Sequence, residues 1–166
     1  MFANILVPLD GTAQSNAALP LARTVAQATG GSITLLRVVK PSESATAAQV
    51  LDDLQRVAKE LSADKGPVKS AVRKGEETAR EILDEIQQQS VDLVIMCTHG
   101  RAGLERVVLG SVTQDVLANS RVPIMLLRPG GRRITHIGKL FVPVDGSPGG
   151  TLALSIAARS IAVSGR

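Results

Sequence analysis

The sequence has almost no aromatic residues and only one cysteine. Its 166 residues include two Phe, no Tyr and no Trp, although 44% of them are hydrophobic. The core must therefore be built from Ala, Val, Leu and Ile, which is typical of buried parallel strands and the helices that cover them. The single cysteine, Cys97, cannot form a disulfide within the chain, so nothing in the sequence indicates an oxidising compartment.

Long apolar runs and targeting signals are also missing. No hydrophobic run approaches the roughly 18 residues that a membrane-spanning helix needs. The first ten residues are interrupted by Pro8 and Asp10 and do not resemble a signal peptide. We therefore expect a cytoplasmic protein with no membrane partner.

The charge favours a small ligand over a nucleic acid. The net charge is +4, which could serve a polyanion. However, the Lys and Arg residues are scattered, and no aromatic residues alternate with them to stack on bases. We expect a small phosphorylated ligand and no nucleic acid.

Short apolar runs alternate with longer amphipathic stretches along most of the chain. This pattern predicts strands at 4–9, 32–39, 68–72, 91–97 and 122–127, and helices at 13–29, 46–62, 78–88 and 111–119. Pro20 should kink or loosen the first helix. Thr78-Ala-Arg-Glu81 matches a capping box, with Glu76 or Glu77 as the alternative start of that helix. The alternation predicts an α/β fold, an open and mostly parallel five-stranded sheet with helices on both faces.

A second copy of the opening segment follows a linker. Residues 129–138 are a linker by composition, and residues 139–147 restate residues 4–12 at an offset of 135 positions. So short a fragment cannot bury a core of its own. Residues 139–166 therefore either pack on the first domain, residues 1–128, or pack on a neighbouring chain, or form the first strand and helix of a truncated second repeat. We favour the truncated repeat.

The strongest sign of a binding site lies between residues 96 and 112. A strand that ends at Met96-Cys97 is followed by a glycine-containing loop, and Gly110-Ser111 then opens a helix. A helix N-terminus offers free N–H groups and a partial positive charge, both suited to phosphate.

The carboxyl end of the first strand completes this predicted site. If the strand order is 3-2-1-4-5, the ends of the first and fourth strands meet where the order reverses, which is the usual ligand crevice of open α/β sheets. There Asp10 can accept hydrogen bonds from a ribose or a base. The residues alone thus predict a phosphorylated ligand in this crevice.

These segments resemble the universal stress protein family. In its nucleotide motif, G-x2-G-x9-G-[S/T], Gly100 is the second glycine and Gly110-Ser111 completes the pattern. The opening Ile-Leu-Val-Pro-Leu-Asp-Gly and the strand Val-Pro-Ile-Met-Leu-Leu also resemble the family. The likeness covers residues 3–128 and begins again at residue 139. It implies a Rossmann-like fold of the adenine nucleotide alpha hydrolase type, with strand order 3-2-1-4-5.

The resemblance implies ATP, or AMP or ADP, as the ligand, with or without Mg²⁺. It further implies a homodimer and a regulatory role in the stress response. By position, Asp10 would contact adenosine, Val38 would meet the adenine through its main chain, and the phosphates would lie on Gly100, Gly110, Ser111 and Val112. The remaining candidate residues around them are Pro8, Leu9, Met96, Cys97, Arg101 and Gly103.

One position departs from the motif, because Cys97 replaces its first glycine. This change leaves open a second interpretation, a dimeric interaction module that binds no nucleotide. Cys97 itself is either a redox sensor or, as we favour, a small core residue. A slow ATPase is the third alternative, disfavoured because the chain has no Gly-x4-Gly-Lys-[Ser/Thr] loop, no evident carboxylate pair for a metal and no nucleophile–base pair.

Overall fold

The computed structural model describes residues 2–62, 66–98, 109–128, 134 and 139–164. Its centre is one parallel sheet in the order β3-β2-β1-β4-β5. The strands are β1 (Asn4–Pro8), β2 (Ser32–Val39), β3 (Val68–Lys74), β4 (Leu93–Cys97) and β5 (Ile124–Leu127). The predicted fold class and strand order are confirmed.

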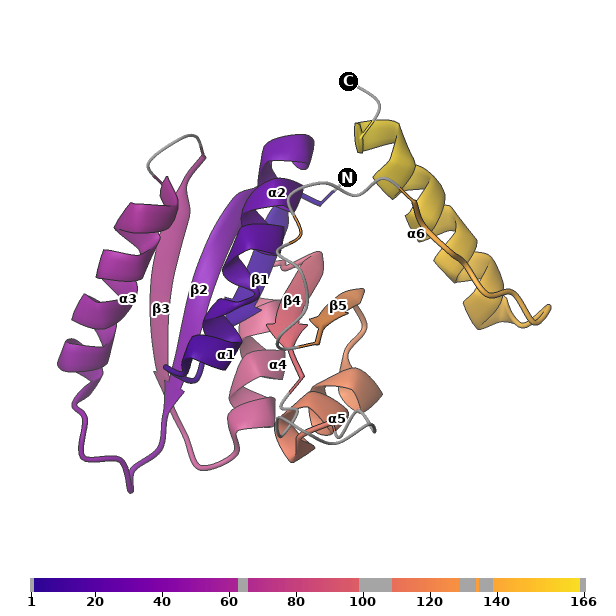
Figure 1. Cartoon of the computed structure of the whole chain (residues 1–166). Coiled ribbons are helices and arrows are strands. Elements are labelled where there is room, and N and C mark those ends of the chain that lie inside the picture. The colour runs from indigo at the N-terminus through magenta and orange to yellow at the C-terminus, as the bar shows by residue number, and fades with distance from the viewer. Residues whose placement is uncertain (1, 63–65, 99–108, 129–133, 135–138, 165–166) are drawn as a thin grey trace.

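Helices cover both faces of this sheet (Figure 1). They are α1 (Ala13–Asn16), α2 (Leu19–Thr29), α3 (Ala47–Ser62), α4 (Thr78–Gln88) and α5 (Ser111–Asn119), and α6 (Pro148–Ser164) follows the domain. Among the described residues, no helix has both the length and the apolar character to cross a membrane.

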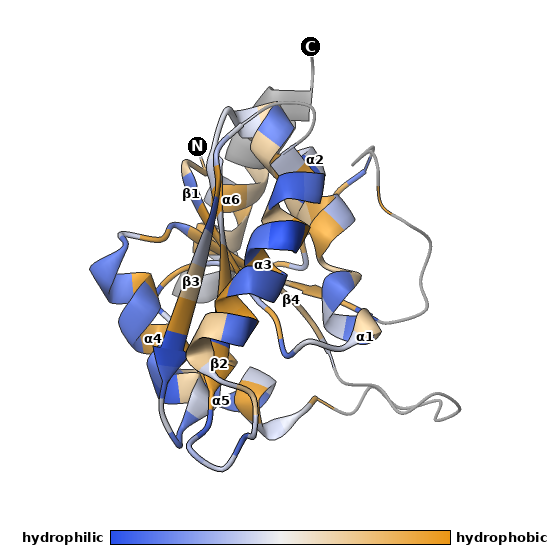
Figure 2. Ribbon diagram, turned by 90° about the vertical axis from the view of Figure 1, so that its left-hand side faces the viewer, coloured by the Kyte–Doolittle hydropathy of each residue, from blue (hydrophilic) through white to orange (hydrophobic). Residues whose placement is uncertain are grey.

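The strands divide the core into two layers because neighbouring side chains of a strand point to opposite faces. Ile5 and Val7 of β1 belong to the layer under α2 and α3, whereas Leu6 belongs to the layer under α4 and α5. Figure 2 shows the outward faces of α3 and α4 as hydrophilic and the strands behind them as largely hydrophobic. The core consists of aliphatic side chains, as the shortage of aromatic residues predicts.

The predicted helix at 13–29 is two helices, so the expectation of a kink at Pro20 is corrected. The chain breaks at Ala17-Ala18, and Pro20 lies in the first turn of α2. A proline is well tolerated there, because the first amides of a helix have no partner within it. Thr12 caps the short α1, its hydroxyl accepting a hydrogen bond from the N–H of Ser15 at 3.2 Å.

The capping box predicted at Thr78 is wrong. Glu77 is the N-cap of α4 and makes no side-chain cap bond. Glu81 instead accepts a hydrogen bond from Nε of Arg73 at 2.7 Å, and Glu85 accepts one from Nη1 of Arg73 at 3.0 Å. The ion pairs with β3 therefore take the carboxylate that the box would have used.

The second copy of the opening segment does not form the predicted strand. Residues 139–145 have no regular secondary structure, and α6 follows them. A strand needs a neighbouring strand for its backbone hydrogen bonds, and α6 instead approaches α2 and stands apart from the sheet (Figure 1). The boundaries of a second repeat stay a prediction.

Candidate functional site

A cavity of about 230 Å³ lies at the carboxyl ends of β1, β2 and β4. Because β2 and β4 lie on opposite sides of β1, this is the point where the strand order reverses. The first turn of α5 and the N-terminal half of α4 close one side. Its wall comprises Pro8, Leu9, Asp10, Ser15, Leu36, Arg37, Val38, Thr78, Ile82, Met96, Cys97, Val112 and Thr113.

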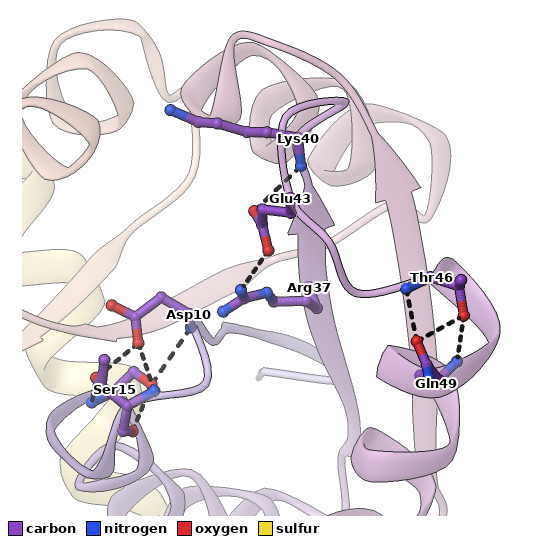
Figure 3. Close-up of polar contacts among 8 residues, drawn as sticks. Asp10, Ser15, Arg37, Lys40, Glu43, Thr46 and Gln49 are labelled. Atoms are coloured by element: carbon purple, nitrogen blue, oxygen red, sulfur yellow. Dashed lines mark hydrogen bonds and ion pairs between the residues drawn. The ribbon is translucent and has the colours of Figure 1, made fainter.

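The turn that follows β1 holds the carboxylate of Asp10 in place. Oδ1 of Asp10 accepts hydrogen bonds from the N–H of Thr12 at 2.9 Å and from its hydroxyl at 2.6 Å. The hydroxyl of Ser15 accepts a bond from the N–H of Asp10 at 3.3 Å (Figure 3). Gly11 makes the turn possible with φ of +83°, a value that favours glycine. The sequence thus builds a rigid acceptor at the cavity wall.

Most of the predicted site residues meet at this cavity. Those in its wall are Pro8, Leu9, Asp10, Val38, Met96, Cys97 and Val112. Gly110 is the N-cap of α5 and Ser111 its first residue, just before the two wall residues Val112 and Thr113. Gly100, Arg101 and Gly103 lie outside the described residues.

The N-terminus of α5 has the features expected for an anion site. Gly110 has extended backbone angles, and no side chain caps the first turn. The N–H groups of that turn have no partner inside the helix. Since Val112 and Thr113 line the cavity, these amides begin at its edge.

Cys97 is a wall residue at the end of β4 and is only 6% exposed. Burial, and then the negative charge of Asp10, raise the pKa of its thiol. A thiol that stays protonated is a poor nucleophile. The structure therefore favours the interpretation of Cys97 as a small buried residue over that of a redox sensor.

Arg37 is the most informative wall residue that sequence reasoning missed. It lies at the carboxyl end of β2, directly before Val38. Its Nη2 donates to Oε2 of Glu43 at 2.9 Å, and Oε1 of Glu43 accepts from the N–H of Lys40 at 3.1 Å (Figure 3). Both contacts, the Lys40 amide first, lower the pKa of Glu43. A lone charge inside the apolar run Leu-Leu-Arg-Val-Val was the available signal.

The described residues offer no obvious place for a metal held by protein alone. Among them, no group of three or more His, Cys, Asp and Glu side chains lies close enough together to bind one. Any ion here would need oxygen atoms from the ligand, as Mg²⁺ often takes from phosphates.

Comparison with known proteins settles the family. The model of the universal stress protein family matches residues 1–128. The chain belongs to the universal stress protein family. Universal stress protein YxiE of Bacillus subtilis is 26% identical over 148 residues, which cover 77% of this chain and 100% of that protein. A universal stress protein of Mycolicibacterium smegmatis is 28% identical over 171 residues, which cover 91% of this chain and 57% of that longer relative.

Solved structures support the same fold. Protein MJ0577 has a TM-score of 0.68 and 24% identity, covering 77% of this chain and 96% of its own. A universal stress protein in complex with cAMP has a TM-score of 0.61 and 19% identity, covering 77% and 98%. The protein from Archaeoglobus fulgidus in complex with dAMP has a TM-score of 0.60 and 13% identity, covering 75% and 97%.

Proposed function

We propose that this universal stress protein binds an adenine nucleotide, ATP or a related one, at the cavity beside β1, and acts as a regulatory protein in the stress response. The observation that carries the proposal is the meeting of Asp10, Val38 and Val112 in one cavity wall at the point where the strand order reverses. Two proteins of this fold have been solved with the adenine nucleotides cAMP and dAMP.

The geometry supports a division of the ligand between two parts of the site. The carboxylate of Asp10 accepts hydrogen bonds from ribose hydroxyls, and the β2 end near Val38 faces the base. The amides at the start of α5 receive the phosphates. The cavity of about 230 Å³ is smaller than the roughly 300–1,000 Å³ usual for ligand pockets, so we expect part of the nucleotide to extend beyond its described walls.

Binding would regulate by shifting populations. A nucleotide that joins the end of β1 to the start of α5 favours whichever conformation holds these two groups at the right distance. The homodimer, the cytoplasmic location and the use of Mg²⁺ are parts of the same proposal.

The direct test releases whatever the purified protein carries. The protein is denatured, and the released small molecule is identified by absorbance and mass. Titration calorimetry with ATP, ADP and AMP, with and without Mg²⁺, then gives the affinities. Recovered adenine nucleotide or a saturable heat supports the proposal.

A variant at the start of α5 makes this test specific. Gly110 has φ of −64°, a value that Leu also adopts, so Gly110→Leu adds a bulky side chain at the start of α5, where we propose that the phosphates lie. We expect at least tenfold weaker ATP binding and little change in adenosine binding. Gly149→Leu, in α6, is the matched control. Protein that is empty and gives no heat with any nucleotide contradicts the proposal and favours the interaction module.

A further inference from the structure

Arg37 carries a charge that the protein only partly pairs. One of its three guanidinium nitrogens binds Glu43, at 2.9 Å. Nε and Nη1 are shielded from solvent and have no hydrogen-bond partner in the described structure. The side chain as a whole is only 18% exposed.

Unpaired hydrogen-bond donors on a buried cation lower the stability of a fold. A buried donor without an acceptor destabilises a protein, and more so when the group is charged. Hydrophobic residues would fill this strand position at no such cost, as Leu36 and Val38 do on either side. The arrangement therefore indicates a partner that is not a side chain of the described protein.

The two unpaired donors, Nε and Nη1, belong to a residue of the cavity wall. Arg37 is part of its wall, and Nη1 lies against the turn after β1, 3.1 Å from the position of a Cβ added to Gly11. In Figure 3 the guanidinium group extends from β2 between Glu43 and the turn of Asp10. Glu43 holds one nitrogen only, so the other two donors are left for a ligand once the side chain turns one of them toward the cavity.

The sheet order decides which part of a nucleotide Arg37 would meet. Arg37 is on β2, while α5, which offers amides for phosphate, follows β4 on the other side of β1. Neighbouring strands are about 4.8 Å apart, so roughly 10 Å separates β2 from β4. Asp10, between them, accepts hydrogen bonds from hydroxyl groups, and the ring nitrogens of a purine remain as acceptors on the β2 side.

We propose that Arg37 binds the base of the nucleotide by donating a hydrogen bond to a purine ring nitrogen, and so helps to select purine nucleosides at this site. This inference rests on the proposed function. It names a specificity residue, an arginine next to Val38, whose contact is with the base and not with the phosphates.

The test compares the protein with its Arg37→Met variant, which keeps an unbranched apolar stem up to the position of Nε and removes every donor. A hydrogen bond from a charged donor predicts that the Kd for adenosine and the Kd for ATP both rise about tenfold or more, by the same factor. A loss for ATP alone would place Arg37 on the phosphates and overturn the proposal. Arg56→Met changes an exposed arginine on α3 and should leave both Kd values unchanged.

Glu43→Gln separates a ligand contact from a structural role. If Arg37 acts on the base, this variant weakens the hold on the guanidinium group by removing the charge of its partner, and adenosine binds as well as before or more tightly. If the ion pair only fixes the loop after β2, Glu43→Gln weakens adenosine binding as much as Arg37→Met does, and the proposal is wrong.

Adenosine analogues that each lack one ring nitrogen identify the atom that Arg37 contacts. With the unaltered protein, one of 1-deaza-, 3-deaza- and 7-deazaadenosine should bind about tenfold more weakly than adenosine, and Arg37→Met should abolish that difference. Unchanged ratios for all three analogues would overturn the proposal while leaving nucleotide binding intact. Failure of adenosine and ATP to bind the unaltered protein would instead overturn the proposed function together with this inference.

Discussion

Residues 4–12 and residues 139–147 are two copies of one segment in very different surroundings. Both contain Val-Pro-x-Asp-Gly, and a helical segment follows each. In the first copy, Leu6 is fully buried in the middle of β1. In the second copy, Phe141 holds the equivalent position with 93% of its surface exposed, and the segment is not a strand.

The turn, in contrast, is the same in both copies. Oδ1 of Asp10 accepts from the N–H of Thr12 at 2.9 Å, and Oδ1 of Asp145 accepts from the N–H of Ser147 at 2.9 Å. The glycines between them, Gly11 and Gly146, have φ of +83° and +80°. The turn needs only its own residues, because the Asp side chain bonds the backbone two residues on. The strand needs a sheet.

The largest difference in stability is expected between two alanine variants, one at the buried Leu6 and one at the exposed Phe141. Leu6→Ala leaves a cavity in the core layer under α4 and α5 and should lower the free energy of unfolding by about 3 kcal/mol. Phe141→Ala changes an exposed position and should alter it by less than about 0.5 kcal/mol. Urea denaturation followed by circular dichroism measures both. A cost above about 1 kcal/mol for Phe141→Ala would show that the second copy is packed, and the contrast would fail.

The two aspartates should differ almost as much in ligand binding. Asp10→Asn removes the acceptor charge from the cavity, and we expect adenosine to bind about tenfold or more weakly. Asp145→Asn, in a turn of the same geometry but away from β4 and α5, should leave binding unchanged. Calorimetry with adenosine tests the pair.

The thiol of Cys97 provides a check that Asp10→Asn acts locally. Because the charge of Asp10 helps to raise the pKa of this thiol, Asp10→Asn should lower that pKa. The pH profile of alkylation should shift to lower pH, while Asp145→Asn leaves it in place. Equal losses of adenosine binding in the two variants would mean that the second turn takes part in a site.

The same contrast between local and distant interactions explains which parts of the fold could be predicted from the sequence. The bounds of β2, α4 and α5 were predicted to the residue, because periodicity and helix signals are local. The break before α2 was missed, since a proline in a first turn and one in mid-helix look alike in a pattern. The strand expected at the start of residues 139–166 does not form at 139–145, because a strand depends on a neighbouring strand that the local pattern does not identify.

For the site, the sequence predicted Asp10 from its place at the end of a strand and the start of α5 from the spacing of a motif. Asp10 lies in the cavity wall, and α5 begins beside it. It did not predict Arg37, because a charged residue near a strand end usually reaches solvent. Its partial burial depends on the turn of Gly11 and on Glu43, which only the folded chain brings together.

A smaller effect is expected from the two turn glycines. Gly11→Ala places a Cβ at positive φ and 3.1 Å from Nη1 of Arg37, so it should cost about 1 kcal/mol of unfolding free energy. Gly146→Ala meets the same backbone strain but nothing within 4 Å. Local opening of an exposed segment can relieve that strain, so the global free energy should change by less than about 0.5 kcal/mol. Similar costs in urea denaturation would indicate that both turns unfold with the domain.

The smallest effect on stability should come from ending the chain at residue 138. The exposed apolar side chains of the removed part, among them Phe141, Val144 and Leu152, contribute little to the core, and α6 approaches the domain at α2. We expect the unfolding free energy to change by less than about 0.5 kcal/mol and the Kd for adenosine to stay the same.

The shortened chain should nevertheless bind less of the dye ANS, because that dye reports exposed hydrophobic surface. Unchanged stability together with weaker ANS binding would show that the exposed surface belongs to residues 139–164. A large loss of stability would mean that residues 139–164 pack against a domain, their own or that of another copy. A change in the number of chains per particle, measured by light scattering, would assign that contact to another copy.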